Sequence, residues 1–187
     1  MISIEKLIEV NSTVCIFIRH GEKDTTQYCL TENGKCEIID FSRKLLTLRQ
    51  KIQVYSSPEK RCVETASIIN SVVNNEENEI HCSAFLGKPG VQVRDEVAYT
   101  KLTDTMKCRD IFKEWKKGWH LDAMNCPEII MEETMAFFRK TAILNGITLY
   151  ISQSGTVACT GYALGIVDYK ADSEDWVDFL DGYILSL

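Results

Sequence analysis

The sequence predicts an α/β fold of three layers, in which a mostly parallel sheet is flanked by helices on both faces. Two runs, 13–18 (TVCIFI) and 147–151 (ITLYI), are almost continuously apolar and rich in β-formers, as is typical of strands buried on both faces. Residues 32–50 and 58–73 carry apolar side chains at helical spacing. Strands that alternate with helices along a chain favour a parallel sheet with crossover helices.

The remaining elements follow from the same patterns. The expected strands are 13–18, 52–55, 79–85, 147–151 and 183–187. The expected helices are 3–10 (capped by Ser3), 32–50, 58–73, 101–117, 128–144 and 155–165, with a helical turn within 172–180. Pro58 is expected at a first helical position, where the backbone N–H that proline lacks has no helical partner in any case. Loops are expected over 21–29, 87–90 and 118–127.

The length of the chain limits the number of domains, and its net charge limits the kinds of partner. At 187 residues, without a linker, repeat or low-complexity segment, the chain is expected to form one domain over 1–187. The net charge of -6 argues against a nucleic acid partner, because a phosphate backbone requires a basic surface. A local basic pocket is compatible with this balance. Neither the oligomeric state nor the substrate can be inferred from the sequence.

The eight cysteines do not indicate a metal site. No pair has CxxC spacing and the chain has three histidines, so no metal is expected. The first 13 residues (MISIEKLIEVNST) contain Glu5 and Glu9 and lack the apolar region of a signal peptide. No apolar run has the length of a membrane span. We therefore expect a cytoplasmic protein with reduced thiols and no membrane partner.

Polar residues follow three of the expected strands abruptly. They are Arg19-His20, Ser56-Ser57 and Ser152-Gln153-Ser154. In open parallel sheets, ligands bind beyond the carboxyl ends of the strands. The three segments are therefore expected to form one site.

The first segment has the composition of a phosphate site. Arg19 offers a planar fork of donors that matches phosphate oxygens, and a neutral imidazole at His20 can attack phosphorus. Gly21 lets the backbone approach closely. The alternative interpretation is a surface tripeptide without function.

The second segment adds a further cation at the same edge. Arg61 falls in the first turn of a helix that follows a strand, so its guanidinium and the helix N-terminus both favour an anion there. The alternative is a solvated helix arginine. Because two such segments occur in one chain, phosphate binding is the favoured interpretation.

Together these segments resemble the histidine phosphatase superfamily, which is also called the phosphoglycerate mutase-like fold. The family has an RHG motif after its first strand (here Arg19–Gly21), a Leu-Thr-x-x-Gly stretch (here 30–34) and a Ser-Ser-Pro-x-x-Arg-x-x-x-Thr-Ala stretch (here 56–66). Segments 85–90 (FLGKPG) and 176–182 (WVDFLDG) resemble one bacterial branch. The resemblance therefore covers nearly the whole chain.

The resemblance implies specific roles. His20 would take the phosphoryl group as a phosphohistidine, which water would then hydrolyse. Arg19 and Arg61 would bind the phosphoryl oxygens and stabilise the charge during transfer. The ligand would be a phosphorylated small molecule or the phosphate ion, and neither a metal nor an organic cofactor is expected.

The chain departs from the family where a second histidine is expected. Gln153 stands at that position, and Ser154 stands where many members have an acid. The Gln153 amide can donate to phosphate, but a neutral hydrogen bond contributes about 1 kcal/mol against about 1.5–3 kcal/mol for one to a charged group. General acid catalysis contributes roughly 10²–10⁴-fold. Phosphate binding is thus expected to survive better than turnover.

Other residues are candidates for the missing functions. Glu96 is the favoured substitute acid, with Asp95 as the second choice. Glu22 directly follows the RHG motif and is expected to orient the phosphate-binding pocket. Arg94 is a candidate for a further phosphate contact, and His120 for the mouth of the site. Each of them is otherwise a solvated surface residue.

Other catalytic classes lack their motifs. No cysteine is followed six residues later by arginine, and no Gly-x-Ser-x-Gly, P-loop or dinucleotide motif occurs. Two functions stay open: a slow or specialised phosphomonoesterase, and a degenerate module that binds phosphate or a phosphorylated partner without turnover. A third alternative is that Gln153 was introduced artificially.

Overall fold

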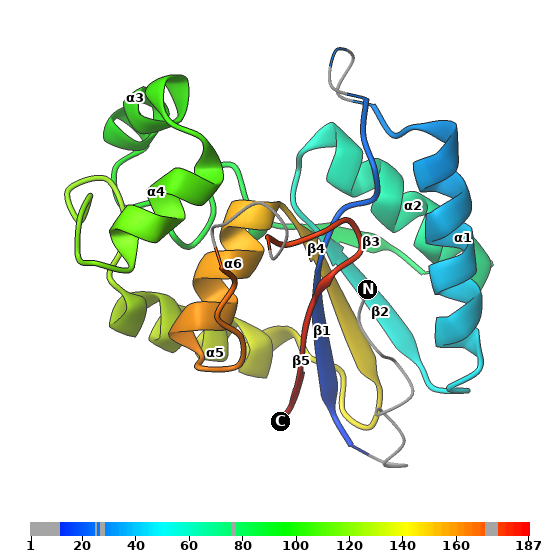
Figure 1. The fold of residues 1–187 in the computed structure, drawn as a ribbon. Coiled ribbons are helices and arrows are strands. Elements are labelled where there is room, and N and C mark those ends of the chain that lie inside the picture. The colour runs from blue at the N-terminus through cyan, green and yellow to red at the C-terminus, as the bar shows by residue number, and fades with distance from the viewer. Residues whose placement is uncertain (1–11, 25, 27–28, 76–77, 171–175) are drawn as a thin grey trace.

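The centre of the molecule is a five-stranded sheet in the order β3-β2-β4-β1-β5 (Figure 1). The computed structural model describes residues 12–24, 26, 29–75, 78–170 and 176–187, so the helix expected over 3–10 lies outside the described residues. The strands are β1 (Val14–Arg19), β2 (Ile52–Ser56), β3 (Ile80–Cys82), β4 (Ile147–Ser152) and β5 (Gly182–Ser186). All pairings are parallel except that of β5 with β1.

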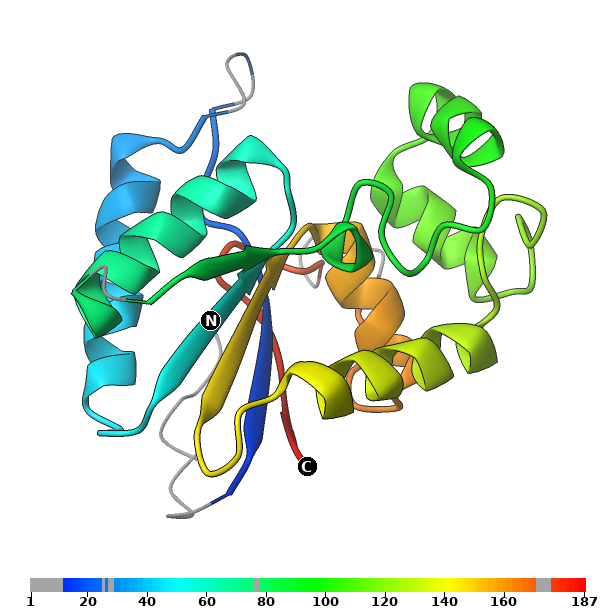
Figure 2. The same cartoon turned by 180° about the vertical axis from the view of Figure 1, so that it is seen from behind.

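Helices cover both faces of this sheet. They are α1 (Glu32–Leu46), α2 (Lys60–Asn74), α3 (Glu96–Thr105), α4 (Cys108–Trp115), α5 (Pro127–Thr141) and α6 (Ser154–Ala163). Helices α1 and α2 form one layer and α5 and α6 the other, while α3 and α4 lie beside the second layer (Figures 1 and 2). The predicted three-layer α/β fold is confirmed. Within the described residues, no helix is long and apolar enough to cross a membrane.

One predicted helix is in fact two. The helix expected over 101–117 is divided into α3 and α4, because Met106 and Lys107 have extended backbones that end one helix and begin the next. Helix α3 begins earlier than predicted, at Glu96, since the Asp95 side chain accepts from the Ala98 N–H at 2.9 Å and caps its first turn. The break turns α3 away from α4 and toward the carboxyl edge of the sheet.

Three boundaries also differ from the predictions. Pro58 precedes helix α2 instead of beginning it, because the extended Glu59 is the N-cap. The strand expected over 79–85 ends at Cys82, where the Ser83 hydroxyl accepts from the Phe85 N–H and starts a short 3-10 turn. The helix expected to reach residue 50 ends at Leu46.

The central strands β1 and β4 are buried on both faces. In β1, Val14, Ile16 and Ile18 face the layer of α1 and α2, whereas Cys15 and Phe17 face the layer of α5 and α6. The same alternation holds in β4. Continuous apolar runs are thus explained by burial on both sides, as the sequence predicts.

The carboxyl ends of β1, β2 and β4 meet at one edge of the sheet. Arg19 pairs with Ser152 in the β1–β4 register, and the His20 N–H donates to the Ser152 carbonyl at 2.9 Å. On the other side of β4, the Ser57 N–H donates to the Ile151 carbonyl at 2.9 Å. The three polar segments that were expected to form one site therefore lie side by side.

We expect Phe17→Ala to lower the free energy of unfolding by about 3–5 kcal/mol. The Phe17 ring is fully buried and packs edge-on against Phe138, Tyr150 and Tyr183, with ring centroids 5.4–6.1 Å away. Urea unfolding followed by circular dichroism measures the loss. Leu144→Ala is the control, because that side chain is 84% exposed and should change stability by less than about 0.5 kcal/mol. Similar losses in both variants would contradict this description of the core.

Candidate functional site

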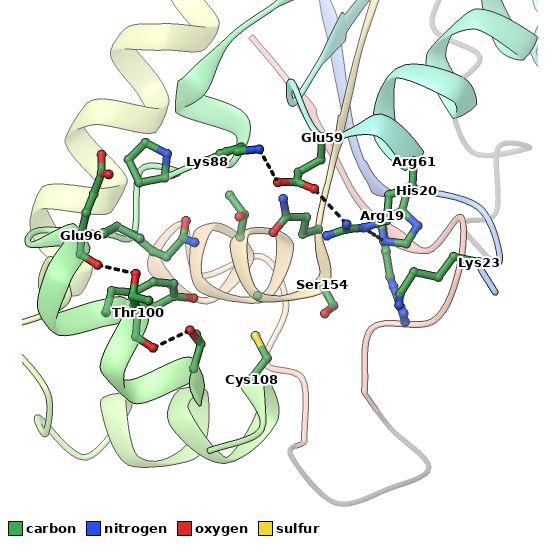
Figure 3. Close-up of a pocket in the computed structure, with 18 residues that line it drawn as sticks. Arg19, His20, Lys23, Glu59, Arg61, Lys88, Glu96, Thr100, Cys108 and Ser154 are labelled. Carbon is green, nitrogen blue, oxygen red and sulfur yellow. Dashed lines mark hydrogen bonds and ion pairs between the residues drawn. The ribbon is translucent and has the colours of Figure 1, made fainter. Parts of the chain in front are cut away.

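A cavity of about 480 Å³ opens at the carboxyl edge of the parallel strands (Figure 3). Its walls come from the segment after β1, the start of α2, the loop after β3, helix α3 and the start of α6. Six of the seven predicted site residues line it: Arg19, His20, Arg61, Glu96, Gln153 and Ser154. The remaining one, Glu22, is not among the lining residues.

His20 is held as a neutral imidazole whose lone pair is on Nε2. It is 2% exposed, and Nδ1 lies 2.7 Å from the Gly21 carbonyl oxygen. A carbonyl only accepts, so Nδ1 carries the proton and Nε2 keeps its lone pair. Burial lowers the pKa of His20 to about 3. The charges of Arg19 and Arg61 act in the same direction, so the imidazole is neutral at neutral pH.

The backbone around His20 is fixed by contacts that require small or hydroxyl residues. A Cβ at Gly21 would lie 2.6 Å from Ile38 Cδ1, so a larger residue would require the buried Ile38 side chain to shift. The Gly21 N–H donates to Thr65 Oγ1 at 3.1 Å, and this hydroxyl donates to the Arg61 carbonyl at 2.7 Å. The RHG motif is thereby attached to helix α2, which supplies Arg61.

Arg61 joins His20 to a carboxylate. Its Nε donates to His20 Nε2 at 3.0 Å, and its Nη1 lies 3.0 Å from Glu59 Oε2. Arg61 is in the first turn of α2, at the positive end of the helix dipole. The lone pair of His20 therefore accepts a hydrogen bond from the guanidinium of Arg61.

Arg19 is positioned by the C-terminal segment of the chain. Its Nη1 donates to the Val177 carbonyl at 2.7 Å, and its guanidinium carbon lies 3.9 Å from the centre of the Phe179 ring. The Phe179 ring also lies 5.9 Å from the His20 ring. Burial lowers the pKa of the Arg19 guanidinium from its ordinary value, although Asp178 opposes this shift. Segment 176–182, which resembles a family branch, thus supports the RHG arginine.

Two lysines of the lining were not identified from the sequence. Lys23 follows the RHG motif by two residues, and its pKa is lowered by burial and then by the charges of Arg61 and Arg19. Lys88 reaches the opposite side of the cavity from the loop after β3 (Figure 3). The signal for Lys23 was its position directly behind the motif, and the signal for Lys88 was its place in segment 85–90, which resembles one bacterial branch.

The lining is locally basic although the chain as a whole is acidic. Among the described residues it contains four basic side chains, Arg19, Lys23, Arg61 and Lys88, and two carboxylates, Glu59 and Glu96. The chain carries a net charge of -6. The local basic pocket that the sequence allowed is therefore present, and it favours an anionic ligand.

Gln153 and Ser154 bring the N-terminus of α6 to the cavity. Gln153 is the N-cap but its side chain makes no capping hydrogen bond, so the first N–H groups of α6 are open to an anion. A Cβ built at Gly87 would lie 3.0 Å from Gln153 Nε2, so the amide packs against that loop. Ser154 hydrogen bonds with Cys108, whose pKa is raised by burial to about 11. Cys108 is thus a protonated thiol.

The candidates for the missing functions lie in different surroundings. Glu96 lines the cavity from the first turn of α3, whereas Asp95 is used as the cap of that helix. Glu22 accepts from Thr31 Oγ1 at 2.7 Å and from Asn33 Nδ2 at 3.1 Å, which lowers its pKa. It secures the start of α1, and no cavity contact supports its predicted role.

Arg94 and His120 also lie outside the lining. Arg94 Nη1 donates to the Leu121 carbonyl at 3.0 Å. His120 Nε2 lies 2.6 Å from Glu114 Oε2. Both side chains stabilise the loop over 118–127. Within the part of the chain that the structure describes, no three His, Cys, Asp or Glu side chains are grouped as metal ligands would be.

Sequence comparisons give no assignment for this chain. No protein-family model matches it. No curated protein matches it either.

Solved structures share its fold. A mycobacterial glucosyl-3-phosphoglycerate phosphatase aligns with a TM-score of 0.55 at 14% identity, over 82% of this chain and 79% of the other. A phosphoserine phosphatase variant from Entamoeba histolytica, in complex with phosphoserine, aligns with a TM-score of 0.54 at 16% identity, over 83% of this chain and 81% of the other. Phosphoglycerate mutase from Bacillus anthracis aligns with a TM-score of 0.53 at 12% identity, over 83% of this chain and 81% of the other. These are members of the histidine phosphatase superfamily, so the resemblance in fold is confirmed.

We expect His20 to make folding stability depend on pH between about 6.5 and about 3. In this range the unfolded chain binds a proton at His20 that the folded chain does not, so stability falls as the pH decreases. The slope from one such group is at most about 1.4 kcal/mol per pH unit. Urea unfolding in anion-poor buffers, from about pH 6.5 to about pH 5, measures it. His20→Asn should have a shallower slope than the wild type, and parallel slopes would contradict a buried neutral imidazole.

Proposed function

We propose that this chain, which has the fold of the histidine phosphatase superfamily, is a phosphomonoesterase that acts through a phosphohistidine at His20. The observation that carries the proposal is the neutral His20, whose Nε2 lone pair faces a cavity beside Arg19 and Arg61. A neutral nitrogen nucleophile and two fixed guanidinium groups are what phosphoryl transfer requires.

Substrate binding uses the basic side chains of the cavity and the N-terminus of α6. The phosphoryl oxygens accept hydrogen bonds from Arg19 and Arg61 and from the open N–H groups at the start of α6. Lys23 adds a third positive charge on the same side of the cavity. The rest of the cavity receives the alcohol part of a phosphorylated small molecule. One phosphatase of this fold, the mycobacterial enzyme, was solved in complex with inorganic phosphate.

The reaction has two steps. In the first, Arg61 Nε moves its hydrogen bond from His20 Nε2 to a phosphoryl oxygen, and the Nε2 lone pair forms a bond to phosphorus. The bond from phosphorus to the leaving oxygen breaks, and that oxygen takes up a proton. The imidazole gains positive charge, and the Gly21 carbonyl that accepts from Nδ1–H stabilises it. In the second, water attacks phosphorus, the N–P bond breaks, and its electron pair returns to Nε2. Inorganic phosphate is then released.

The altered half of the pocket makes this enzyme slow or specialised. The Gln153 amide can donate to a phosphoryl oxygen but cannot carry the positive charge of an imidazolium. The Ser154 hydroxyl is no general acid at neutral pH. Both changes act on turnover more than on binding, because Arg19 and Arg61 are unchanged.

A non-catalytic phosphate-binding module is the second candidate. The observation that favours it is the same pair of residues, Gln153 and Ser154, at the N-terminus of α6. Binding alone requires the cations and not the nucleophile. The two functions differ in whether phosphate is ever bonded covalently to His20.

The single domain over 1–187 and the cytoplasmic location stay predictions.

Trapping of the phosphoenzyme decides between these functions. We expect rapid acid-free quenching after mixing with p-nitrophenyl phosphate to yield an acid-labile, base-stable phosphohistidine, located at His20 by mass spectrometry. His20→Asn should yield none while it still binds inorganic phosphate. Binding of phosphate to the wild type without phosphoenzyme or hydrolysis would exclude the enzyme and leave the binding module.

We expect Arg61→Ala to weaken the binding of inorganic phosphate by about 10–100-fold, because hydrogen bonds to charged groups contribute about 1.5–3 kcal/mol. Isothermal titration calorimetry measures the dissociation constant. Arg94→Ala is the matched control, since this arginine donates to the Leu121 carbonyl outside the cavity. Equal affinities in the two variants would contradict the placement of phosphate at Arg61.

We expect the double substitution Gln153→His with Ser154→Asp to raise the rate of phosphomonoester hydrolysis by about 100-fold or more, because it restores a cation and an acid at the start of α6. Steady-state release of phosphate measures the rate. An unchanged rate would show that other parts of the pocket limit turnover.

A further inference from the structure

Glu59 directs its carboxylate into the cavity instead of capping its own helix. An N-cap side chain usually accepts a hydrogen bond from the first turn of the helix, but Glu59 makes no such bond at the start of α2. Its Oε2 lies 3.0 Å from Arg61 Nη1, and its Oε1 lies 3.5 Å from Lys88 Nζ (Figure 3). The carboxylate is therefore committed to the phosphate site.

Glu59 belongs to the same wall of the cavity as Gln153. Its backbone N–H donates to Ser57 Oγ at 3.3 Å, and Ser57 Oγ donates to the Gly87 carbonyl at 3.3 Å. A Cβ built at Gly87 would lie 3.0 Å from both Ser57 Oγ and Gln153 Nε2. The carboxylate thus lies in the part of the pocket where the chain has a neutral amide.

Glu59 is closer to the nucleophile than the acid that the sequence favoured. Arg61 bridges Glu59 and His20, since its Nη1 contacts the carboxylate and its Nε contacts His20 Nε2. Glu96, the other carboxylate of the lining, is on α3 across the cavity from His20 (Figure 3). Of the two, only Glu59 is in contact with a group that touches the nucleophile.

We propose that Glu59 is the proton donor to the leaving oxygen in the phosphatase reaction, and the base toward water in its second step. The proposal rests on the proposed function. It assigns to Glu59 the role that neither Gln153 nor Ser154 can fill.

Substrate binding prepares the carboxyl for this role. In the free protein Glu59 is the anion that Arg61 and Lys88 contact. An arriving phosphate dianion takes these cations as its own partners and places negative charge beside the carboxylate. Both changes favour uptake of a proton from solvent by Glu59.

The proton balance then closes over one cycle. As the bond from phosphorus to the leaving oxygen breaks, the Glu59 carboxyl gives its proton to that oxygen, and the alcohol leaves. The Glu59 carboxylate next takes a proton from the water that attacks phosphorus, while the N–P bond to His20 breaks. When phosphate leaves, Glu59 gives this proton back to solvent, and its carboxylate returns to its contacts with Arg61 and Lys88.

Leaving-group dependence tests the proposal. The first step is measured as phosphohistidine formation by rapid quench, with an aryl phosphate (p-nitrophenyl phosphate) and an alkyl phosphate (glycerol phosphate). A nitrophenolate leaves without protonation, whereas an alkoxide requires it. We expect Glu59→Gln to slow phosphorylation by the alkyl phosphate by about 100-fold or more and by the aryl phosphate by less than about 10-fold. Glu133→Gln, at an exposed position of α5 outside the cavity lining, is the control and should behave as the wild type with both.

The possible outcomes are distinct. Equal rates of wild type and Glu59→Gln with the alkyl phosphate would overturn the proposal, and so would equal losses with both substrates, which indicate that Glu59 merely positions Arg61. Glu59→Asp keeps a carboxyl on a shorter side chain and should recover part of the alkyl rate. A wild type that forms no phosphohistidine with either substrate would overturn the proposed function and this inference together.

Discussion

The parallel pairing of β1 with β4 is the constraint on which the site depends. It aligns Arg19 with Ser152 and joins the His20 N–H to the Ser152 carbonyl, so the nucleophile and the start of α6 leave the sheet next to each other. Layers of helices bury both faces of this pair, which makes a shift in register costly because it would expose apolar side chains.

The second organising factor is a concentration of positive charge around a neutral imidazole. Burial and the nearby arginines hold His20 unprotonated, and the Gly21 carbonyl determines which nitrogen keeps the lone pair. The arginines also repel each other and Lys23, whose pKa is lowered first by burial and then by their charges. The Glu59 carboxylate offsets part of this repulsion when no phosphate is bound. Under the proposed function, a phosphate dianion would do the same more completely, and the site would prefer that ligand for this reason.

The proposed function places different chemical requirements on the two halves of the pocket. The half made of Arg19, His20 and Arg61 needs fixed charge and a lone pair, and the structure provides both. The half made of Gln153 and Ser154 contributes a helix terminus and neutral groups. Under the proposed function, binding and catalysis draw on different residues. An acid at Glu59, the N-cap of α2, would then reconcile the retained His20 with the altered half.

The sequence by itself determined the sheet, its buried strands and the three polar segments at its edge, because apolar periodicity and strand-end motifs are local properties. It also identified six of the residues that line the cavity. Only the tertiary structure decided which way the charged side chains turn. Glu22 faces Thr31 and Asn33, whereas Glu59 faces Arg61 and Lys88. These partners come from segments apart in the sequence, and the free energy of a charged side chain depends on the charges and donors that folding places around it.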